Sequence, residues 1–378
     1  MSMRLATRMP EKPGARRASG HLPACLALAL ALALASPASA NPPELARMWT
    51  YANGQPREVP FSVLSMTVFS AAGVRRVTVD AATEDIAEDG PSRQGDPYAG
   101  HGTWTASLGY RRETLDFNIA GLDGHPNVVS ALDWDTDMLE VRMAGDWLAD
   151  SGFFATVDLA HARGFSGEMR DSDYGEDNRR DEFSRSYAKS RGSLVSRLSF
   201  GLGWRFAPRS GASLTPLLGY AWQRHNLRAS QGRQHIDTRS GYAGPFPGLD
   251  THFKPRWHGP WMGLRLDARV TERLAFRLLA KRQWFDYRAF ANWNLRDDFS
   301  HPVSFRQEGD SRGWQLEIGA SWRISPASAL TFSLDQYWQR LKNGKQRFFA
   351  ADGQATDVGL NRARWESWSA ALGYRMDF

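Results

Sequence analysis

A short acidic segment carries the side chains in this sequence that are best suited to chemistry. It reads Gly167-Glu-Met169-Arg-Asp171-Ser-Asp173-Tyr174, with two aspartates two positions apart. Residues at i and i+2 of a β-strand point to the same face, so we expect Asp171 and Asp173 to lie together. Close carboxylates raise each other's pKa, which lets such a pair hold a proton and position a water molecule. The segment is therefore a candidate site for activating water.

The acidic segment is also compatible with a solvated loop or with a calcium site. Acidic pairs are common on solvated loops, where they do no chemistry. For calcium, Asp171, Asp173 and Glu182 fall on positions 1, 3 and 12 of an EF-hand loop, but position 6 is Glu176 instead of glycine. The calcium pattern fails there. Seven other histidines show no metal-ligand spacing, so no metal site is predicted: His101, His125, His161, His225, His235, His252 and His258.

The first 40 residues are predicted to be an export signal. A basic start at Arg16 and Arg17 precedes an apolar run over residues 22–35, and Ala38-Ser39-Ala40 ends it. Cleavage is expected after Ala40. The run is shorter than the roughly 20 residues that a membrane-spanning helix needs. We therefore interpret it as a cleaved signal and not as an anchor.

Removing the signal changes what charge and cysteine content imply. The mature chain has 42 Lys and Arg against 40 Asp and Glu, a formal charge of +2 instead of +6. This small excess gives no indication of nucleic-acid binding. The single cysteine, Cys25, lies within the signal. The exported chain therefore cannot be held together by disulfides.

Several segments alternate between apolar and polar residues, which is the pattern of a membrane β-strand. Residues 368–378 place apolar or aromatic residues at even positions, and residues 314–324 and 194–206 repeat the pattern. After residue 40 no stretch approaches 18 consecutive apolar residues, so a membrane protein of this sequence must cross the bilayer as a closed barrel. The predicted fold is an all-β, transmembrane antiparallel β-barrel. A soluble sandwich, whose strands also alternate, is the alternative.

The connections are predicted to differ between the two ends of this barrel. Polar stretches at residues 167–192, 229–256 and 286–312 are interpreted as long extracellular loops, and residues 207–212 and 325–328 as short turns. Residues 41–102 are rich in proline and turn residues, with one expected strand at 61–69. We interpret residues 41–102 as an N-terminal extension in the periplasm, which leaves residues 103–378 for the barrel.

From about residue 103 to 378 the sequence resembles the omptin family of outer-membrane proteases. The acidic segment resembles the Gly-x-Met/Val-x-Asp-x-Asp-aromatic motif at the mouth of the omptin barrel. The resemblance implies a ten-stranded barrel in the bacterial outer membrane, with long extracellular loops, that stands well above the membrane. Further stretches resemble omptin motifs in the same order: Ser107-Leu108-Gly109, Ser130 to Trp134, Asp181-Glu182, Gly219-Tyr220, Gly259 to Leu264 and Ile324-Ser325-Pro326.

The resemblance implies a catalytic role for Asp171 and Asp173. Omptins hold a water molecule between an Asp-Asp pair and an Asp-x-His pair, whose histidine acts as the general base. At the expected place this chain has Ala291-Asn292-Trp293 or Trp293-Asn294-Leu295. The nearest substitutes are Asp298 and His301, which are three residues apart and would face opposite ways on a strand.

Two further features of omptins can be compared with this chain. The carboxylates that bind a basic substrate side chain fall at Phe117 and near Ala289. The phosphates of lipid A are held on the outer barrel surface, at a site that Tyr220, Arg224 and Arg256 match. Ordinary anchoring at the membrane interface is the alternative role of these three residues. The resemblance implies lipopolysaccharide as a required partner and no other cofactor.

Two functions remain open at this point. The first is an aspartic-type endopeptidase that cleaves polypeptides at the cell surface with Asp171 and Asp173. The second is a non-catalytic barrel that binds lipopolysaccharide or another surface partner. The side chain that faces Asp171 distinguishes them, because an imidazole about one water molecule away favours the enzyme and an apolar Trp293 favours the binding protein.

Overall fold

The chain divides into two units, residues 1–93 and 94–378. The computed structural model describes residues 48–52, 55–59, 61–70, 73–81, 102–207 and 211–378, so the expected signal peptide lies outside the described residues. In the first unit β1 (Met48–Ala52) pairs with β2 (Gln55–Val59), and β3 (Phe61–Ser70) pairs with β4 (Gly73–Ala81), both antiparallel. The strand expected at residues 61–69 is therefore confirmed as β3.

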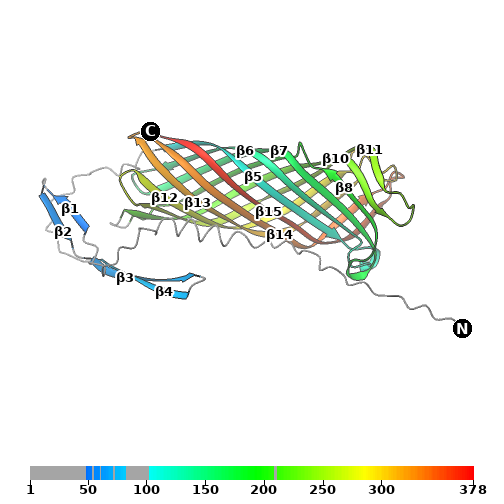
Figure 1. Ribbon diagram of the computed structural model, residues 1–378, viewed down its shortest axis with the longest axis horizontal. Helices are drawn as coiled ribbons and strands as arrows, with labels where there is room; N and C mark the ends of the chain where they lie inside the picture. Colours follow the sequence, from blue (N-terminus) through cyan, green and yellow to red (C-terminus); the bar gives the residue numbers. More distant parts are fainter. Residues whose placement is uncertain (1–47, 53–54, 60, 71–72, 82–101, 208–210) are drawn as a thin grey trace, which may run out of the picture. The chain divides into compact units, whose positions relative to one another are not determined.

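The second unit is a closed antiparallel barrel with ten strand positions (Figure 1). One position is shared by β8 and β9, which both pair with β7 and β10, and the ring closes where β15 pairs with β5. The predicted ten-stranded barrel is thus confirmed. Its strands are β5 (Gly102–Ile119), β6 (Ser130–Leu148), β7 (Phe153–Glu176), β8 (Arg180–Lys189), β9 (Leu194–Trp204), β10 (Ala212–Asp237), β11 (Gly244–Arg269), β12 (Leu274–Asn292), β13 (Phe305–Ser325), β14 (Ser328–Phe349) and β15 (Ala355–Asp377).

The alternating segments turn their apolar side chains outward. On β15, Leu372 and Met376 are 70% and 54% exposed, whereas Ser369 and Arg375 are buried on the inside. In the alternating segments of β9 and β13 the exposed side chains are also apolar. Together with those of β15 they form an apolar band around the outside of the barrel. A soluble sandwich would bury these side chains, so that alternative is wrong. Among the described helices, none is long and apolar enough to cross a membrane.

The strands continue far beyond the apolar band, which corrects the prediction of long loops. Most of residues 167–192, 229–256 and 286–312 belongs to strands, and the connections between them are much shorter, such as residues 238–243 and 293–304. Above the lipid both faces of a strand can be polar, so the alternation disappears although the hydrogen-bonded ladder continues. The short turn predicted at residues 325–328 joins β13 to β14, and a short connection also separates the end of β9 at Trp204 from the start of β10 at Ala212. They mark the periplasmic end, because outer-membrane barrels carry their short turns there.

Side chains fill the lumen in two layers. Near the extracellular mouth lies an aromatic layer of Phe117, Trp134, Phe253, Trp293 and Phe305, in which the rings of Trp134 and Phe253 stack 5.3 Å apart. Such ring pairs add about 0.5–1.5 kcal/mol beyond the area that they bury. Below it lies an ionic layer whose charged side chains pair across the barrel: Arg111, Glu113, Glu140, Arg142, Arg197 and Asp335.

Candidate functional site

A bulge in β7 determines where the acidic segment points. The pairing between β6 and β7 shifts by one residue around Phe165, and Gly167 follows with a φ of +143°. A Cβ atom at Gly167 would lie 2.3 Å from the carbonyl oxygen of Asp135, so only glycine fits. Because a shift by one residue exchanges the two faces of a strand, the bulge turns Asp171 and Asp173 into the lumen.

Polar and basic side chains surround the two aspartates at the mouth, above the apolar band. Ser130, opposite Asp173 on β6, places its hydroxyl 3.5 Å from a carboxylate oxygen of Asp171. Burial raises the pKa of Asp171 well above its ordinary value, and the Asp173 carboxylate raises it further. Burial also raises the pKa of Asp173, while a hydrogen bond from Ser130 and the charge of Arg296 oppose this shift. The pair can therefore hold a proton more readily than isolated aspartates do.

The positions at which omptins carry their base hold apolar side chains. Ala291 is 2% exposed and belongs to the core. Trp293 packs on the aromatic layer, with its ring 4.8 Å from that of Phe305. No histidine among residues 102–207 and 211–378 forms a hydrogen bond or an ion pair with Asp171 or Asp173. No imidazole of the described barrel is thus in direct contact with the acidic pair.

The two substitutes for the missing base are not brought together. Asp298 accepts two hydrogen bonds of 2.7 Å from the guanidinium of Arg296. His301 lies with its Nδ1 atom 2.8 Å from the side-chain oxygen of Asn292. Each substitute therefore has its own partner. Arg296, which the sequence analysis did not identify, is a charged group that lowers the pKa of both aspartates, and no spacing rule would have found it.

The positions at which omptins bind a basic substrate side chain are also apolar. Phe117 is a member of the aromatic layer, and Ala289 is fully buried in the core. Asp116, beside Phe117, is on the outer face and accepts hydrogen bonds of 2.6 Å from both Arg362 and Arg364. The mouth therefore has no described carboxylate at either of these positions to receive an arginine or lysine side chain.

The outer surface carries a row of three arginines just above the apolar band. Arg224 on β10 lies directly opposite Arg256 on β11, and Arg256 lies directly opposite Arg288 on β12. All three are exposed, and none forms an ion pair with a carboxylate of the described barrel. Like charges that face each other across strands destabilise a sheet. We name Arg224, Arg256 and Arg288 the arginine row.

Aromatic residues flank the arginine row on the side of the membrane. Tyr220 and Trp222 precede Arg224 on the same face of β10, with ring centroids 4.6 Å apart. The Tyr220 hydroxyl lies 3.0 Å from Nδ1 of His258. On the other side of the row, toward the mouth, Arg256 lies over the Phe290 ring, 5.6 Å from its centroid. Aromatic residues of this kind mark the height of lipid headgroups, so the arginine row lies where phosphates of an outer-leaflet lipid are found.

The sequence analysis missed Arg288, although it named Tyr220, Arg224 and Arg256. The register between β11 and β12 brings Arg288 beside Arg256, and no pattern within one strand reveals it. In the described part of the chain, no group of three or more histidine, cysteine, aspartate or glutamate side chains is arranged to hold a metal ion.

Comparisons with known proteins agree with this architecture. The barrel is similar to the outer membrane protease OmpT from Escherichia coli, with a TM-score of 0.64 and 14% identity over 76% of this chain and 100% of that one; at this identity the likeness concerns the fold alone. Two other matches are weaker. The Pseudomonas putida toluene transporter TodX matches with a TM-score of 0.30 and 12% identity over 75% of this chain and 91% of that one. The Pseudomonas aeruginosa outer membrane protein OprG matches with a TM-score of 0.32 and 10% identity over 75% of this chain and 98% of that one. No curated protein matches the sequence.

The sequence of the barrel identifies its family. The family model for the Protochlamydia outer membrane protein matches residues 105–378, which is nearly the whole barrel. This match agrees with the export signal expected from the sequence and with the apolar band that the structure shows. The chain therefore belongs to the Protochlamydia outer membrane protein family and is a β-barrel of the bacterial outer membrane.

Proposed function

We propose that this protein is a non-proteolytic outer-membrane barrel that binds lipopolysaccharide through the arginine row. The observation that carries the proposal is the direct apposition of Arg224, Arg256 and Arg288, none of which forms an ion pair in the described barrel, although Glu308 lies opposite Arg288 on β13. Three neighbouring guanidinium groups repel one another, and a phosphorylated lipid removes this repulsion while accepting charge-assisted hydrogen bonds. The match of Tyr220, Arg224 and Arg256 to the lipid A site of omptins supports the same ligand.

The mouth of the barrel supports the non-proteolytic part of the proposal. Asp171 and Asp173 can hold a proton and a water molecule, but the water lacks a base because Ala291 and Trp293 occupy the expected positions. General-base catalysis contributes about 10²–10⁴-fold to a rate. A pair without its base is therefore expected to leave peptide cleavage too slow to serve a cell.

An omptin-like endopeptidase is the second candidate, and one observation favours it. Asp171 and Asp173 share the lumen face at the mouth, with pKa values raised by burial. In this alternative a group other than the missing histidine accepts the proton of the attacking water, and polypeptides at the cell surface are the substrates.

Comparing intact with dephosphorylated lipopolysaccharide tests the proposed ligand. We expect the purified protein in detergent to bind the intact lipid, and the dephosphorylated lipid at least tenfold more weakly, because the arginine row loses its hydrogen-bond acceptors. Tryptophan fluorescence during lipid titration measures both affinities, since Trp222 is beside Arg224. Equal affinity for the two lipids would rule out recognition of the phosphates.

A further inference from the structure

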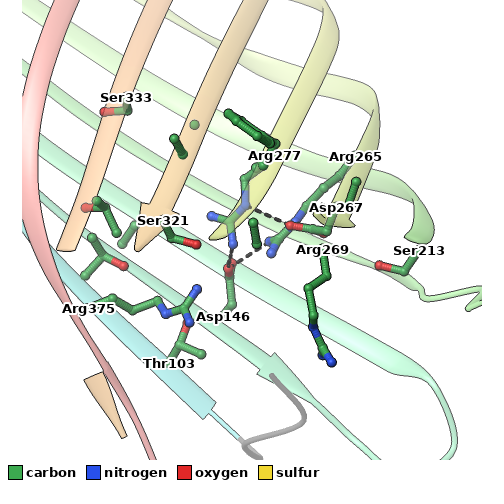
Figure 2. A pocket seen from close by; sticks show the side chains of 18 of the residues that line it. Thr103, Asp146, Ser213, Arg265, Asp267, Arg269, Arg277, Ser321, Ser333 and Arg375 are labelled. Carbon is green, nitrogen blue, oxygen red and sulfur yellow. Dashed lines mark hydrogen bonds and ion pairs between the residues drawn. The ribbon is translucent and has the colours of Figure 1, made fainter. Parts of the chain in front are cut away.

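A cavity of about 800 Å³ opens at the periplasmic end of the barrel, below the ionic layer. Its rim includes residues of the short turns, Ala207, Gly211 and Glu272, and its wall is formed by lumen-facing residues of the strands. Figure 2 shows Arg265 and Arg277 converging on Asp146 and Asp267 inside it. The volume falls in the range of small-molecule sites.

The charges that line the cavity do not balance. Seven arginines line it against four acidic side chains, a formal excess of three positive charges: Arg142, Arg205, Arg265, Arg269, Arg277, Arg323 and Arg375 against Asp146, Asp267, Glu272 and Glu317. Of the acids, Glu317 already accepts a 2.6 Å hydrogen bond from Arg142. Acidic side chains just behind the lining offset part of this excess, because Arg142 also pairs with Asp158 and Asp335, and Arg375 pairs with Asp377.

Arg265 and Arg277 already satisfy the two central carboxylates. Asp146 accepts hydrogen bonds of 2.8 Å from Arg265 and 3.1 Å from Arg277. Asp267 accepts bonds of 2.7 Å and 3.1 Å from the Nε atoms of the same two arginines. These four bonds engage both oxygens of Asp267 and one oxygen of Asp146, and a third guanidinium lies beside them.

Arg205 is that third guanidinium. Its side chain is 12% exposed, and its closest approach to a described carboxylate is 3.8 Å, to Asp267, which is too long for a hydrogen bond. Its Nε atom is buried without a hydrogen-bond partner among the described residues. Arg205 and Arg265 both lie over the ring of Phe154, with guanidinium carbons 5.2 and 4.7 Å from its centroid. A largely buried guanidinium with one unsatisfied donor, beside a cavity lined by further arginines, is suited to an anionic ligand.

We propose that this cavity is a second binding site, which takes a small phosphate-bearing ligand from the periplasmic side and holds it with Arg205. The planar fork of a guanidinium matches two oxygens of a phosphate group. The site is at the opposite end of the barrel from the mouth, and it does not depend on the arginine row or on lipopolysaccharide.

Calorimetric titration of the purified full chain with inorganic pyrophosphate in neutral detergent tests this site. We expect binding that weakens with salt, and a dissociation constant at least tenfold higher for Arg205→Gln, which removes the guanidinium and its unsatisfied Nε donor. Arg205→Lys keeps the charge but lacks the planar fork. Its dissociation constant is expected to lie between those of the wild type and Arg205→Gln. Arg273→Gln, with the same loss of charge in an exposed turn at the same end, should bind like the wild type.

Two results would overturn the proposal. The first is that the wild-type protein does not bind pyrophosphate although its urea unfolding curve shows a folded barrel. The second is that Arg205→Gln and the wild type bind pyrophosphate equally well. Repeating the titration in vesicles of phosphatidylcholine and of phosphatidylglycerol identifies the source of the phosphate. If only phosphatidylglycerol abolishes pyrophosphate binding, the ligand is a lipid headgroup. If binding persists in both, it is a free phosphate compound.

Discussion

Replacing all three arginines of the arginine row with glutamine is expected to weaken binding of lipopolysaccharide about 100- to 1,000-fold. A hydrogen bond to a charged group contributes about 1.5–3 kcal/mol, and 1.4 kcal/mol corresponds to a factor of ten in affinity. Arg224, Arg256 and Arg288 are exposed, so we take the lower end of this range for each. Since the effects of replacing neighbouring residues are not additive, the combined loss of affinity is expected to be at most the product of the three single losses.

The binding loss must be separated from a general loss of positive charge. Arg179, Arg180 and Arg191 are exposed arginines outside the row, and their triple replacement with glutamine removes the same charge. This control variant should bind lipopolysaccharide within about threefold of the wild type. If both triple variants lose affinity equally, the arginine row has no specific role and only net charge matters.

Replacing Arg111 with methionine is expected to destabilise the barrel by about 3–5 kcal/mol, the usual effect of removing one partner from a buried ion pair. Arg111 is fully buried in the ionic layer. It donates hydrogen bonds of 2.8 and 3.0 Å to Glu113, 3.0 Å to Glu140 and 2.8 Å to Ser367. Without it, each of two buried carboxylates loses one of its cationic partners.

The neighbouring residue provides a matched control for Arg111. Arg112 points outward, where its ion pair with Asp135 is about 40% exposed on both sides. Exposed ion pairs contribute about 0–1 kcal/mol, so Arg112→Met should shift the free energy of unfolding by no more than that. Urea unfolding in lipid vesicles, followed by tryptophan fluorescence, measures both variants. Equal shifts for the two would mean that the ionic layer does not hold the barrel together.

The part of the fold that lipid surrounds could be predicted from the sequence, and the part above it could not. Residues 314–324 and 368–378 must alternate, because one face meets lipid and the other meets the polar lumen. Above the membrane no such requirement exists, so β10 and β11 continue through residues that the sequence analysis assigned to a loop. Backbone hydrogen bonds hold the strands together there. Because nearly every residue type can form these bonds, no sequence pattern reveals them.

The candidate sites show the same division between local and long-range information. Spacing alone put Asp171 and Asp173 on one face, but the bulge before Gly167 decides that this face is the lumen. Arg288 and Arg205 gain their importance from strand register and from closure of the barrel, which join residues far apart in the chain. The absence of Asp-x-His was visible in the sequence; that Trp293 packs into an aromatic layer was not.

Cleavage of a broad peptide library in the presence of lipopolysaccharide is the most direct test of whether this barrel is a binding protein or a protease. The refolded wild type is compared with Asp171→Ala/Asp173→Ala, after both are shown to be folded and to bind the lipid. We expect no cleavage by either protein, because Ala291 and Trp293 occupy the positions at which omptins carry their base. Cleavage by the wild type that the double variant abolishes would contradict this and establish an endopeptidase with a base other than histidine.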